Sequence, residues 1–167
     1  MSDSFSPIRK LETSDPVDEF DCGQPELNRY LQRYAWSNQK ANSAQTYVAC
    51  SGSKIVGYYS LSVAGVDHIH APDRIVKGLA KHPVPVMLLA RLAVERDFQR
   101  QGLGAALLKD ALLRTLQAAD IAGIRALLVH AKDEAARQWY LRFDFEPGPI
   151  NSMHLFLLLK DIQHAVR

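Results

Sequence analysis

The sequence is poor in cysteine: its two cysteines, Cys22 and Cys50, lie far apart and form no C-x-x-C pair. Two such thiols do not make a disulfide framework, so we expect unreactive thiols in a reducing compartment. Long apolar runs are also missing, and without about 18 consecutive apolar residues no membrane-spanning helix is predicted. The first residues, Met1–Ser4, lack the charged and apolar blocks of a signal peptide, so we expect a cytoplasmic protein.

A strong excess of one charge is missing as well. The 20 lysines and arginines stand against 18 aspartates and glutamates, which gives a net charge of +2. This balance argues against binding nucleic acid through overall charge, so such a partner would need a local basic cluster. The 167 residues, 47% of them hydrophobic, are enough for a buried core. We expect one domain over residues 1–167, without linkers or internal repeats.

In the first half of the chain, the apolar pattern predicts a strand, a helix and a hairpin. The strand covers residues 7–12, and the helix runs from Pro25 to about residue 38, because proline suits a first helical turn. Its apolar face carries Leu27, Tyr30, Leu31 and Tyr34. Glycine and serine between two β-rich runs, residues 47–50 and 55–61, predict the turn of the hairpin.

In the second half, helices alternate with buried strands. After a short helix at residues 72–81, the apolar run 86–94 is typical of a central strand buried on both faces. A glycine-rich turn then leads into a helix from Gly104 to about residue 119 with a wide apolar stripe. A strand is expected at residues 124–129, and it is followed by a helix with Ala136, Trp139, Tyr140 and Phe143 on one face. A last strand at residues 153–159 and a short tail complete the chain. This order predicts an α/β domain with a central mixed, twisted β-sheet flanked by helices.

The turn from Gln99 to Gly104 has the composition of a phosphate-binding site. N–H groups at the start of a helix lack intrahelical partners and lie at the positive end of its dipole. Two glycines let phosphate oxygens approach the main chain, and Arg96 and Arg100 add positive charge. The G-x-G-x-x-G dinucleotide turn and the G-x-x-x-x-G-K-[ST] P-loop are both absent. From these residues alone, a turn that only joins a strand to a helix is the alternative.

The motif Gln99-x-x-Gly102-x-Gly104, which follows Leu92-Ala93-Val94, resembles the Q/R-x-x-G-x-G/A motif of GNAT-superfamily acetyltransferases. The resemblance implies the GNAT (N-acyltransferase) fold and an acetyl-CoA-dependent N-acetyltransferase. In that family the strand before the turn pairs with the pantetheine arm, and the turn takes the pyrophosphate. No metal is expected. The resemblance assigns cofactor binding to Leu92, Ala93, Val94, Gln99, Arg100, Gln101, Gly102, Leu103, Gly104, Ala105, Asp133 and Ala136.

Tyr140 lies in the predicted helix that follows the strand at 124–129. Its residue type alone fits a buried aromatic side chain with a satisfied hydroxyl equally well. The motif Ala136-x-x-Trp139-Tyr140-x-x-Phe143 resembles the GNAT pattern A-x-x-[FW]-Y-x-x-[FG], and this resemblance implies that Tyr140 is the general acid. A phenol with a pKa of about 10 stays protonated at neutral pH and can donate to the departing CoA thiolate. Relatives often carry glycine where Asp144 stands, and aspartate tolerates the left-handed conformation better than most residues.

The segment from Phe20 to Ala35 resembles the F-D-C-G-x-x-x-L-x-x-[FY]-L-x-x-x-A opening of TacT-type toxins, which are GNAT proteins that acetylate the α-amino group of aminoacyl-tRNA. Residues 78–79, 84–86 and 89–94 also resemble that group. The resemblance implies a type II toxin that blocks translation, an aminoacyl-tRNA substrate and a homodimer. It also implies a ribbon-helix-helix antitoxin, through which the complex represses its own operator DNA. The alternatives are a GNAT enzyme for a small amine or a protein N-terminus, and a non-catalytic CoA-binding module.

Basic residues in three groups are candidates for tRNA binding, although each group could be an ordinary solvated face. They are Arg29, Arg33, Lys40, Arg74, Lys77, Lys81, Arg137 and Arg142. If they converge around the acceptor site, activity should be sensitive to salt.

Two other polar features are expected to have no chemical role. Glu95, just past the strand, is expected to be a solvated carboxylate rather than a general base. An α-amino group, with a pKa near 7.7–8.0, is partly neutral without a strong base. His68-x-His70 offers two metal ligands without partners, so we expect a surface loop there.

Overall fold

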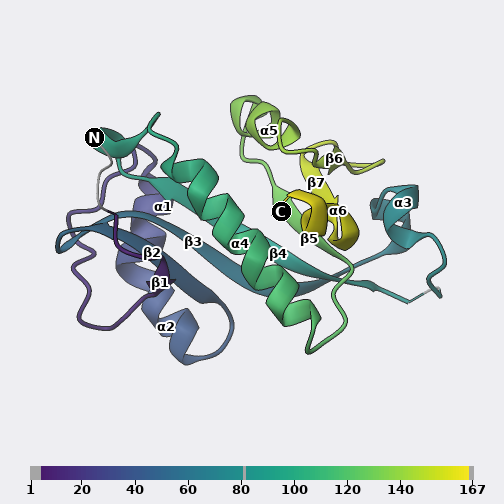
Figure 1. Cartoon of the computed structure of the whole chain (residues 1–167), viewed down its shortest axis with the longest axis horizontal. Helices are drawn as coiled ribbons and strands as arrows, with labels where there is room; N and C mark the ends of the chain where they lie inside the picture. The colour runs from purple at the N-terminus through teal and green to yellow at the C-terminus, as the bar shows by residue number, and fades with distance from the viewer. Residues whose placement is uncertain (1–4, 81, 166–167) are drawn as a thin grey trace. The chain divides into compact units, whose positions relative to one another are not determined.

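The computed structural model describes residues 5–80 and 82–165 (Figure 1). The expectations for Met1–Ser4 and for Lys81 therefore lie outside the described residues. Described strands form a sheet in the hydrogen-bonded order β1-β2-β3-β4-β5-β7-β6. They are β1 (Arg9–Lys10), β2 (Gln45–Ser51), β3 (Lys54–Val66), β4 (Val84–Val94), β5 (Ala126–His130), β6 (Glu146–Pro147) and β7 (His154–Leu158). The parallel pair β4–β5 beside antiparallel pairs confirms the mixed sheet of an α/β fold.

The helices are α1 (Pro25–Arg29), α2 (Ala35–Lys40), α3 (Asp73–Val76), α4 (Leu103–Ala119), α5 (Glu134–Leu141) and α6 (Leu159–Ala165). A π-helical turn, η1 (Tyr30–Tyr34), joins α1 to α2, and 3-10 turns lie at η2 (His68–His70) and η3 (Arg96–Phe98). Within the described ranges, no helix has the length and apolar character needed to cross a bilayer.

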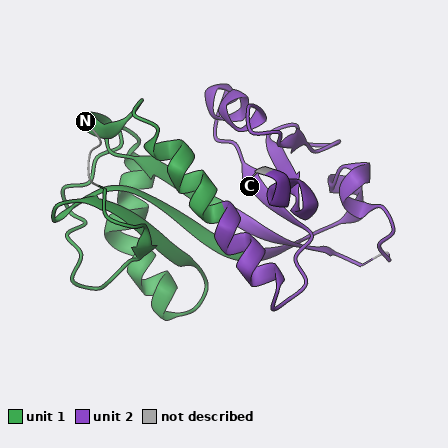
Figure 2. Cartoon of the chain, viewed as in Figure 1, with its two compact units in different colours: residues 1–62, 90–111 green, residues 63–89, 112–167 purple. Residues whose placement is uncertain are grey.

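The chain divides into two compact units, which Figure 2 shows in different colours. Unit 1 contains Met1–Ser62 and Ala90–Ala111, and unit 2 contains Val63–Leu89 and Leu112–Arg167. Each unit thus takes two separate stretches of the chain, and strands β3 and β4 and helix α4 run from one unit into the other.

In unit 1, the helical run Pro25–Lys40 covers the core, but its apolar face differs from the predicted one. The π-helical turn is closed by the Ala35 N–H, which donates to the Tyr30 carbonyl oxygen five residues back. This wide turn adds a residue and shifts the helical phase. As a result Ala35 is fully buried and Tyr34 is 50% exposed, so the predicted burial of Tyr34 is wrong.

The predicted hairpin in unit 1 is confirmed. Ser51 pairs with Lys54 across a two-residue turn, in which Gly52 adopts a φ of +60°. Further along β3, Gly57 lets helix α4 approach the strand. A Cβ atom at that position would lie 2.9 Å from a methyl carbon of Leu107 and 3.3 Å from one of Leu103. A glycine on the strand therefore allows the first turns of α4 to pack closely against the sheet.

In unit 2, β4 and β5 pair in parallel over Val86–Leu89, and β5 pairs with β7 in antiparallel register. The core includes Ile75, Val86, Ala126 and Phe156. Two sequence predictions need correction here. Helix α3 is shorter than expected and is followed by Gly78, which has a φ of +80°. The expected C-terminal tail begins instead as helix α6, whose Ile162 is fully buried.

Candidate active site

The predicted phosphate turn lies in unit 1, between strand β4 and helix α4. Arg100 and Gly102 both adopt left-handed backbone conformations, with φ values of +64° and +86°. The Gly102 carbonyl oxygen accepts the first helical hydrogen bond, from the Ala106 N–H at 3.1 Å. The N–H groups of Leu103, Gly104 and Ala105 therefore stand in the helix's first turn, where intrahelical partners are lacking. Since Gly102 is exposed and no atom would crowd a Cβ there, this open turn of small residues fits a pyrophosphate.

The side chain of Gln99 is held inside the protein. Its amide nitrogen donates to the Val94 carbonyl oxygen at 2.8 Å and to the Cys22 carbonyl oxygen at 3.0 Å. These bonds use both amide protons, and the main-chain N–H of Gln99 donates to the Arg96 carbonyl oxygen at 3.5 Å. Gln99 therefore supports the turn from within the protein, and its role as a cofactor ligand stays a prediction.

Glu95 is buried, with 5% of its surface exposed, so the prediction of a solvated carboxylate is wrong. One carboxylate oxygen accepts from the Asp21 N–H at 2.8 Å, and the other lies 3.5 Å from the Lys54 ammonium group. The main chain adds a bond from the Glu95 N–H to the Val56 carbonyl oxygen. Glu95 therefore fastens the N-terminal segment to the end of β4.

The Asp21-Cys22-Gly23 segment is held by a network of hydrogen bonds. One oxygen of Asp21 accepts from the Gly23 N–H at 2.9 Å and from the Asn28 amide at 3.0 Å. Asn28 in turn accepts from the Cys22 N–H, and the Arg96 N–H donates to the Asp21 carbonyl oxygen. These bonds keep the pKa of the Asp21 carboxyl below its ordinary value, with the Gly23 N–H as the largest cause. The segment that resembles the TacT-type opening thus contacts the base of the phosphate turn.

The end of strand β4 departs from the fully buried strand that the sequence predicts. Its pairing with β5 covers Val86–Leu89, while the strand itself continues to Val94. Of these last residues only Ala93 is buried, and Leu92 and Val94 are half-buried. The residues of β4 that precede the phosphate turn therefore lie outside the parallel pairing with β5. This fits the cofactor-binding role predicted for Leu92, Ala93 and Val94.

Tyr140 lies in unit 2 near the end of helix α5, where its ring packs edge-on against Trp139 and Phe145 at centroid distances of 5.0 and 5.5 Å. Burial raises the pKa of Tyr140 above its ordinary value of 10. Across the described part of the chain its hydroxyl forms no hydrogen bond, so a satisfied structural hydroxyl does not explain this residue. A fixed ring with a protonated, unengaged hydroxyl has the properties of a proton donor.

Helix α5 begins at a side-chain cap. The Asp133 carboxylate accepts from the Ala136 N–H at 2.8 Å, which satisfies one of the free donors of the first turn. Asp133 and Ala136, both predicted cofactor residues, thus bond to each other. Arg137, a predicted tRNA contact, is half-buried and donates to the Ser152 carbonyl oxygen at 3.0 Å and to Glu134 at 3.3 Å.

The other predicted tRNA contacts among the described residues are exposed, and they fall into two groups. Arg29, Arg33 and Lys40 lie along the helical run of unit 1, and Arg74, Lys77 and Arg142 lie in unit 2. Arg74 and Lys77 line one pocket together with Arg125 and Lys160. Sequence reasoning missed these last two residues, since they lie about 50 and 80 positions further along with no motif linking them.

The histidines at 68 and 70 form the short turn η2. The Nε2 atom of His68 is buried and has no hydrogen-bond partner. Over residues 5–80 and 82–165, no group of three potential ligands could hold a metal ion.

A family model for the acetyltransferase (GNAT) domain matches residues 42–147. The chain belongs to the GNAT acetyltransferase family, and its mixed sheet with flanking helices is the GNAT fold. Within that family it is 43% identical, over 97% of both sequences, to the tRNA-acetylating toxin of Mycobacterium tuberculosis.

Solved structures of a second toxin, AtaT, are also similar. AtaT in complex with acetyl-methionyl-tRNAfMet is 26% identical, with a TM-score of 0.90 over 98% of this chain and 100% of that one. An AtaT mutant bound to acetyl-CoA and to the C-terminus of the antitoxin AtaR is 26% identical, with a TM-score of 0.82 over 96% of both chains. The AtaT–AtaR complex bound to DNA is 27% identical, with a TM-score of 0.78 over 96% of this chain and 99% of that one.

Proposed function

We propose that this protein is the toxin of a type II toxin–antitoxin system. It transfers acetyl from acetyl-CoA to the α-amino group of aminoacyl-tRNA and thereby blocks translation. The observation that carries the proposal is the 43% identity to a tRNA-acetylating toxin over nearly the full length of both chains. Support comes from the phosphate turn and from the unengaged hydroxyl of Tyr140.

The donor binds along β4 and at the start of α4. The main chain of Leu92 and Val94 pairs with the pantetheine arm, beyond the residues that β5 engages. Main-chain N–H groups of the turn that follows Gln99, up to Ala105, take the pyrophosphate, with the helix dipole favouring its negative charge. Arg100, which is exposed, adds a positive charge. Acetyl-CoA itself supplies the activated acyl group as a thioester.

The acceptor's amine attacks the thioester carbonyl carbon, a C–N bond forms, and the C–S bond breaks. The sulfur leaves with the bonding electrons and takes a proton from the Tyr140 hydroxyl, while the amine loses a proton to water. Because burial raises the pKa of Tyr140, the phenol is fully protonated at neutral pH. The α-amino group has an ordinary pKa of about 7.7–8.0 and is partly neutral before it attacks, so no strong base is required.

The partners follow from the same assignment. A ribbon-helix-helix antitoxin binds the toxin and blocks it, and the complex reaches operator DNA through the antitoxin. The toxin is a homodimer formed from single-domain chains, and it acts in the cytoplasm, where charged tRNA is found. AtaT, which is similar in structure, has been solved with its antitoxin's C-terminus and, as the AtaT–AtaR complex, on DNA.

The test is to express the full chain and to follow both growth and the charged tRNA pool. Growth should stop, and N-acetylated aminoacyl-tRNA should accumulate. Purified protein should transfer radiolabelled acetyl to bulk charged tRNA in preference to polyamines or peptides. Transfer to polyamines without transfer to charged tRNA would contradict the proposal, and no transfer to any amine would favour a CoA-binding module.

A further inference from the structure

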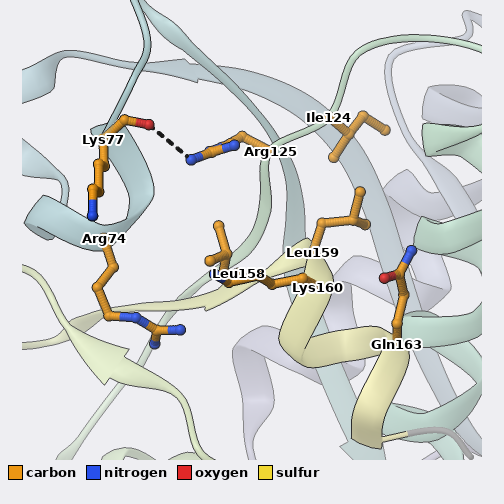
Figure 3. A pocket seen from close by; sticks show the side chains of 8 residues that line it. All are labelled: Arg74, Lys77, Ile124, Arg125, Leu158, Leu159, Lys160 and Gln163. Carbon is orange, nitrogen blue, oxygen red and sulfur yellow. Dashed lines mark hydrogen bonds between the residues drawn. The ribbon is translucent and has the colours of Figure 1, made fainter.

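A pocket of about 280 Å³ in unit 2 has a cationic lining (Figure 3). Its side chains come from helix α3 and the residue after it, from the segment that leads into β5, from the end of β7 and from helix α6. Four of the eight lining residues, Arg74, Lys77, Arg125 and Lys160, are positively charged, and none is acidic. The remaining lining is apolar except for the amide of Gln163. Such a wall attracts a small anionic group.

The two arginines of the pocket are fixed by the fold. Arg74 pairs with the carboxylates of Asp161 at 3.0 Å and Glu146 at 3.5 Å. Arg125 donates from Nε to the Ile75 carbonyl oxygen at 2.7 Å and from one terminal nitrogen to the Lys77 carbonyl oxygen at 3.1 Å, the bond drawn in Figure 3. Carbonyl oxygens leave the guanidinium charge uncompensated, so Arg125 presents a rigid positive charge at the pocket.

The two lysines of the pocket have no anionic partner in the described part of the chain. Lys77 and Lys160 are both exposed, and their ammonium groups form no hydrogen bond or ion pair there. Both carboxylates pair with Arg74, so the other three cations of the lining have no anionic partner in the described part of the chain. Gathering such charges in one place is unfavourable until an anion binds between them.

We infer that this pocket binds a backbone phosphate of the tRNA substrate. The inference rests on the proposed function, which it deepens. A phosphodiester is singly charged and has exposed oxygens, which suits the remaining donors of Arg125 and two flexible ammonium groups. The apolar wall suits the sugar beside it, and the volume of about 280 Å³ admits a sugar-phosphate unit. Because such a contact is independent of base sequence, it serves every tRNA that carries a suitable amino acid.

The test uses the full-length protein and the variants Lys160→Gln and Lys77→Gln/Lys160→Gln. Neither lysine side chain has a hydrogen bond or ion pair to lose in the described part of the chain, so both variants should fold and keep the Tm of the wild type. The control is Lys10→Gln, which removes the same charge from an exposed lysine of β1 outside any proposed site. Binding of bulk tRNA is measured at several salt concentrations. KM is then measured for charged tRNA, for aminoacyl-adenosine, which lacks tRNA backbone phosphates, and for acetyl-CoA.

We expect the slope of log affinity against log salt to fall by about one for Lys160→Gln and by about two for the double variant. The KM for charged tRNA should rise several-fold, with a much smaller change for aminoacyl-adenosine, and Lys10→Gln should match the wild type. An unchanged slope would overturn the inference. Equal rises for both acceptors, or a rise for acetyl-CoA alone, would also overturn it.

Two further experiments test whether the pocket binds another anion instead of tRNA. If orthophosphate raises the Tm of the wild type but not of the variants, while the wild type and the variants bind tRNA equally well, the site binds free phosphate and the inference is wrong. If the variants lose affinity for the antitoxin but not for tRNA, the pocket binds an acidic peptide instead. The tRNA titration needs no acetyl transfer, so it can support the pocket even if the proposed reaction fails on every charged tRNA.

Discussion

The side-chain amide of Gln99 donates a hydrogen bond to the main-chain carbonyl oxygen of Cys22 at 3.0 Å, across 77 positions of sequence. A second bond from the same amide reaches the Val94 carbonyl oxygen at 2.8 Å. One side chain thus links the phosphate turn, the end of β4 and the N-terminal segment, all within unit 1. The first residue of the Q-x-x-G-x-G motif therefore acts by positioning the turn rather than by reaching the phosphate with its side chain.

Replacing Gln99 by leucine should weaken acetyl-CoA binding, because leucine keeps the volume but has no donors. Two hydrogen bonds at about 0.5–1.5 kcal/mol each predict a loss of roughly 1–3 kcal/mol in the free energy of unfolding. The KM for acetyl-CoA should rise several-fold with a smaller effect on kcat. Steady-state kinetics and urea unfolding measure both quantities. The control is Gln117→Leu, on the exposed far part of α4, and an identical KM in the two variants would contradict the positioning role.

Substitutions of Glu95 distinguish a structural role of its carboxylate from a role as general base. Its carboxylate holds the Asp21 N–H and faces Lys54 inside unit 1, so Glu95→Ala leaves a donor without its partner. That change should cost about 1–3 kcal/mol of stability. Glu95→Gln keeps an acceptor for Asp21 and should retain most of kcat, as measured with charged tRNA at saturating acetyl-CoA. A thousandfold loss of kcat in a well-folded Glu95→Gln would instead identify Glu95 as the general base.

The contrast between the turn and Glu95 shows what the sequence could predict. The turn was predictable because its conformation is local. Position 102 has a positive φ, which glycine adopts without strain, and the apolar stripe of α4 starts directly after it. Glu95 was not predictable, because its burial depends on Asp21, 74 positions away, and no local pattern announces that contact.

Two other sequence predictions, the buried face of the first helix and the residues of the basic pocket, were wrong or incomplete for related reasons. The regular spacing predicted Tyr34 on the buried face, but one π-helical turn moved Ala35 there instead. Charge clustering predicted Arg74 and Lys77 as binding residues. Arg125 and Lys160 join them only because α3, the residues just before β5 and α6 meet in unit 2, which the order of elements does not specify.

Tyr140→Phe should lower kcat by about 10²–10⁴-fold, the usual contribution of a positioned acid. The unfolding midpoint should stay close to that of the wild type, because the hydroxyl forms no hydrogen bond in the described chain. Since burial raises the pKa of Tyr140 above 10, the acid stays protonated throughout pH 7–10. Wild-type kcat should therefore show no decline up to pH 10. A decline centred near pH 9, absent in the phenylalanine variant, would place the acid's pKa below its ordinary value and count against this environment.

The ion pair between Arg9 and Asp15 predicts a pH dependence of stability. The guanidinium donates to both carboxylate oxygens, at 2.9 and 2.8 Å, and these bonds lower the pKa of Asp15. The pKa of Asp15 in the folded protein lies below its unfolded value of about 3.9, so the ionised carboxylate stabilises the folded state above pH 3.9. This stabilisation is lost as the pH falls through the folded-state pKa. The stability difference between wild type and Asp15→Asn should thus be constant from pH 7 to 5 and shrink below pH 4. Urea unfolding across this range measures it, and a constant difference down to pH 2.5 would refute the linkage.

Asp144 lies just after helix α5 with a φ of +68°, a conformation that glycine adopts without strain. Its N–H bonds to the Leu141 carbonyl oxygen at 3.2 Å, which closes the end of the helix, while its exposed carboxylate has no partner in the described chain. Asp144→Gly should remove Cβ strain of about 1 kcal/mol, and the added freedom of the unfolded glycine should offset part of it. We therefore expect a gain of about 0.5 kcal/mol in the free energy of unfolding and an unchanged kcat. Asp144→Ala keeps the Cβ without the local polarity that helps aspartate there, so it should destabilise the protein. Equal unfolding free energies for the glycine and alanine variants would show that the left-handed backbone carries no strain at this position.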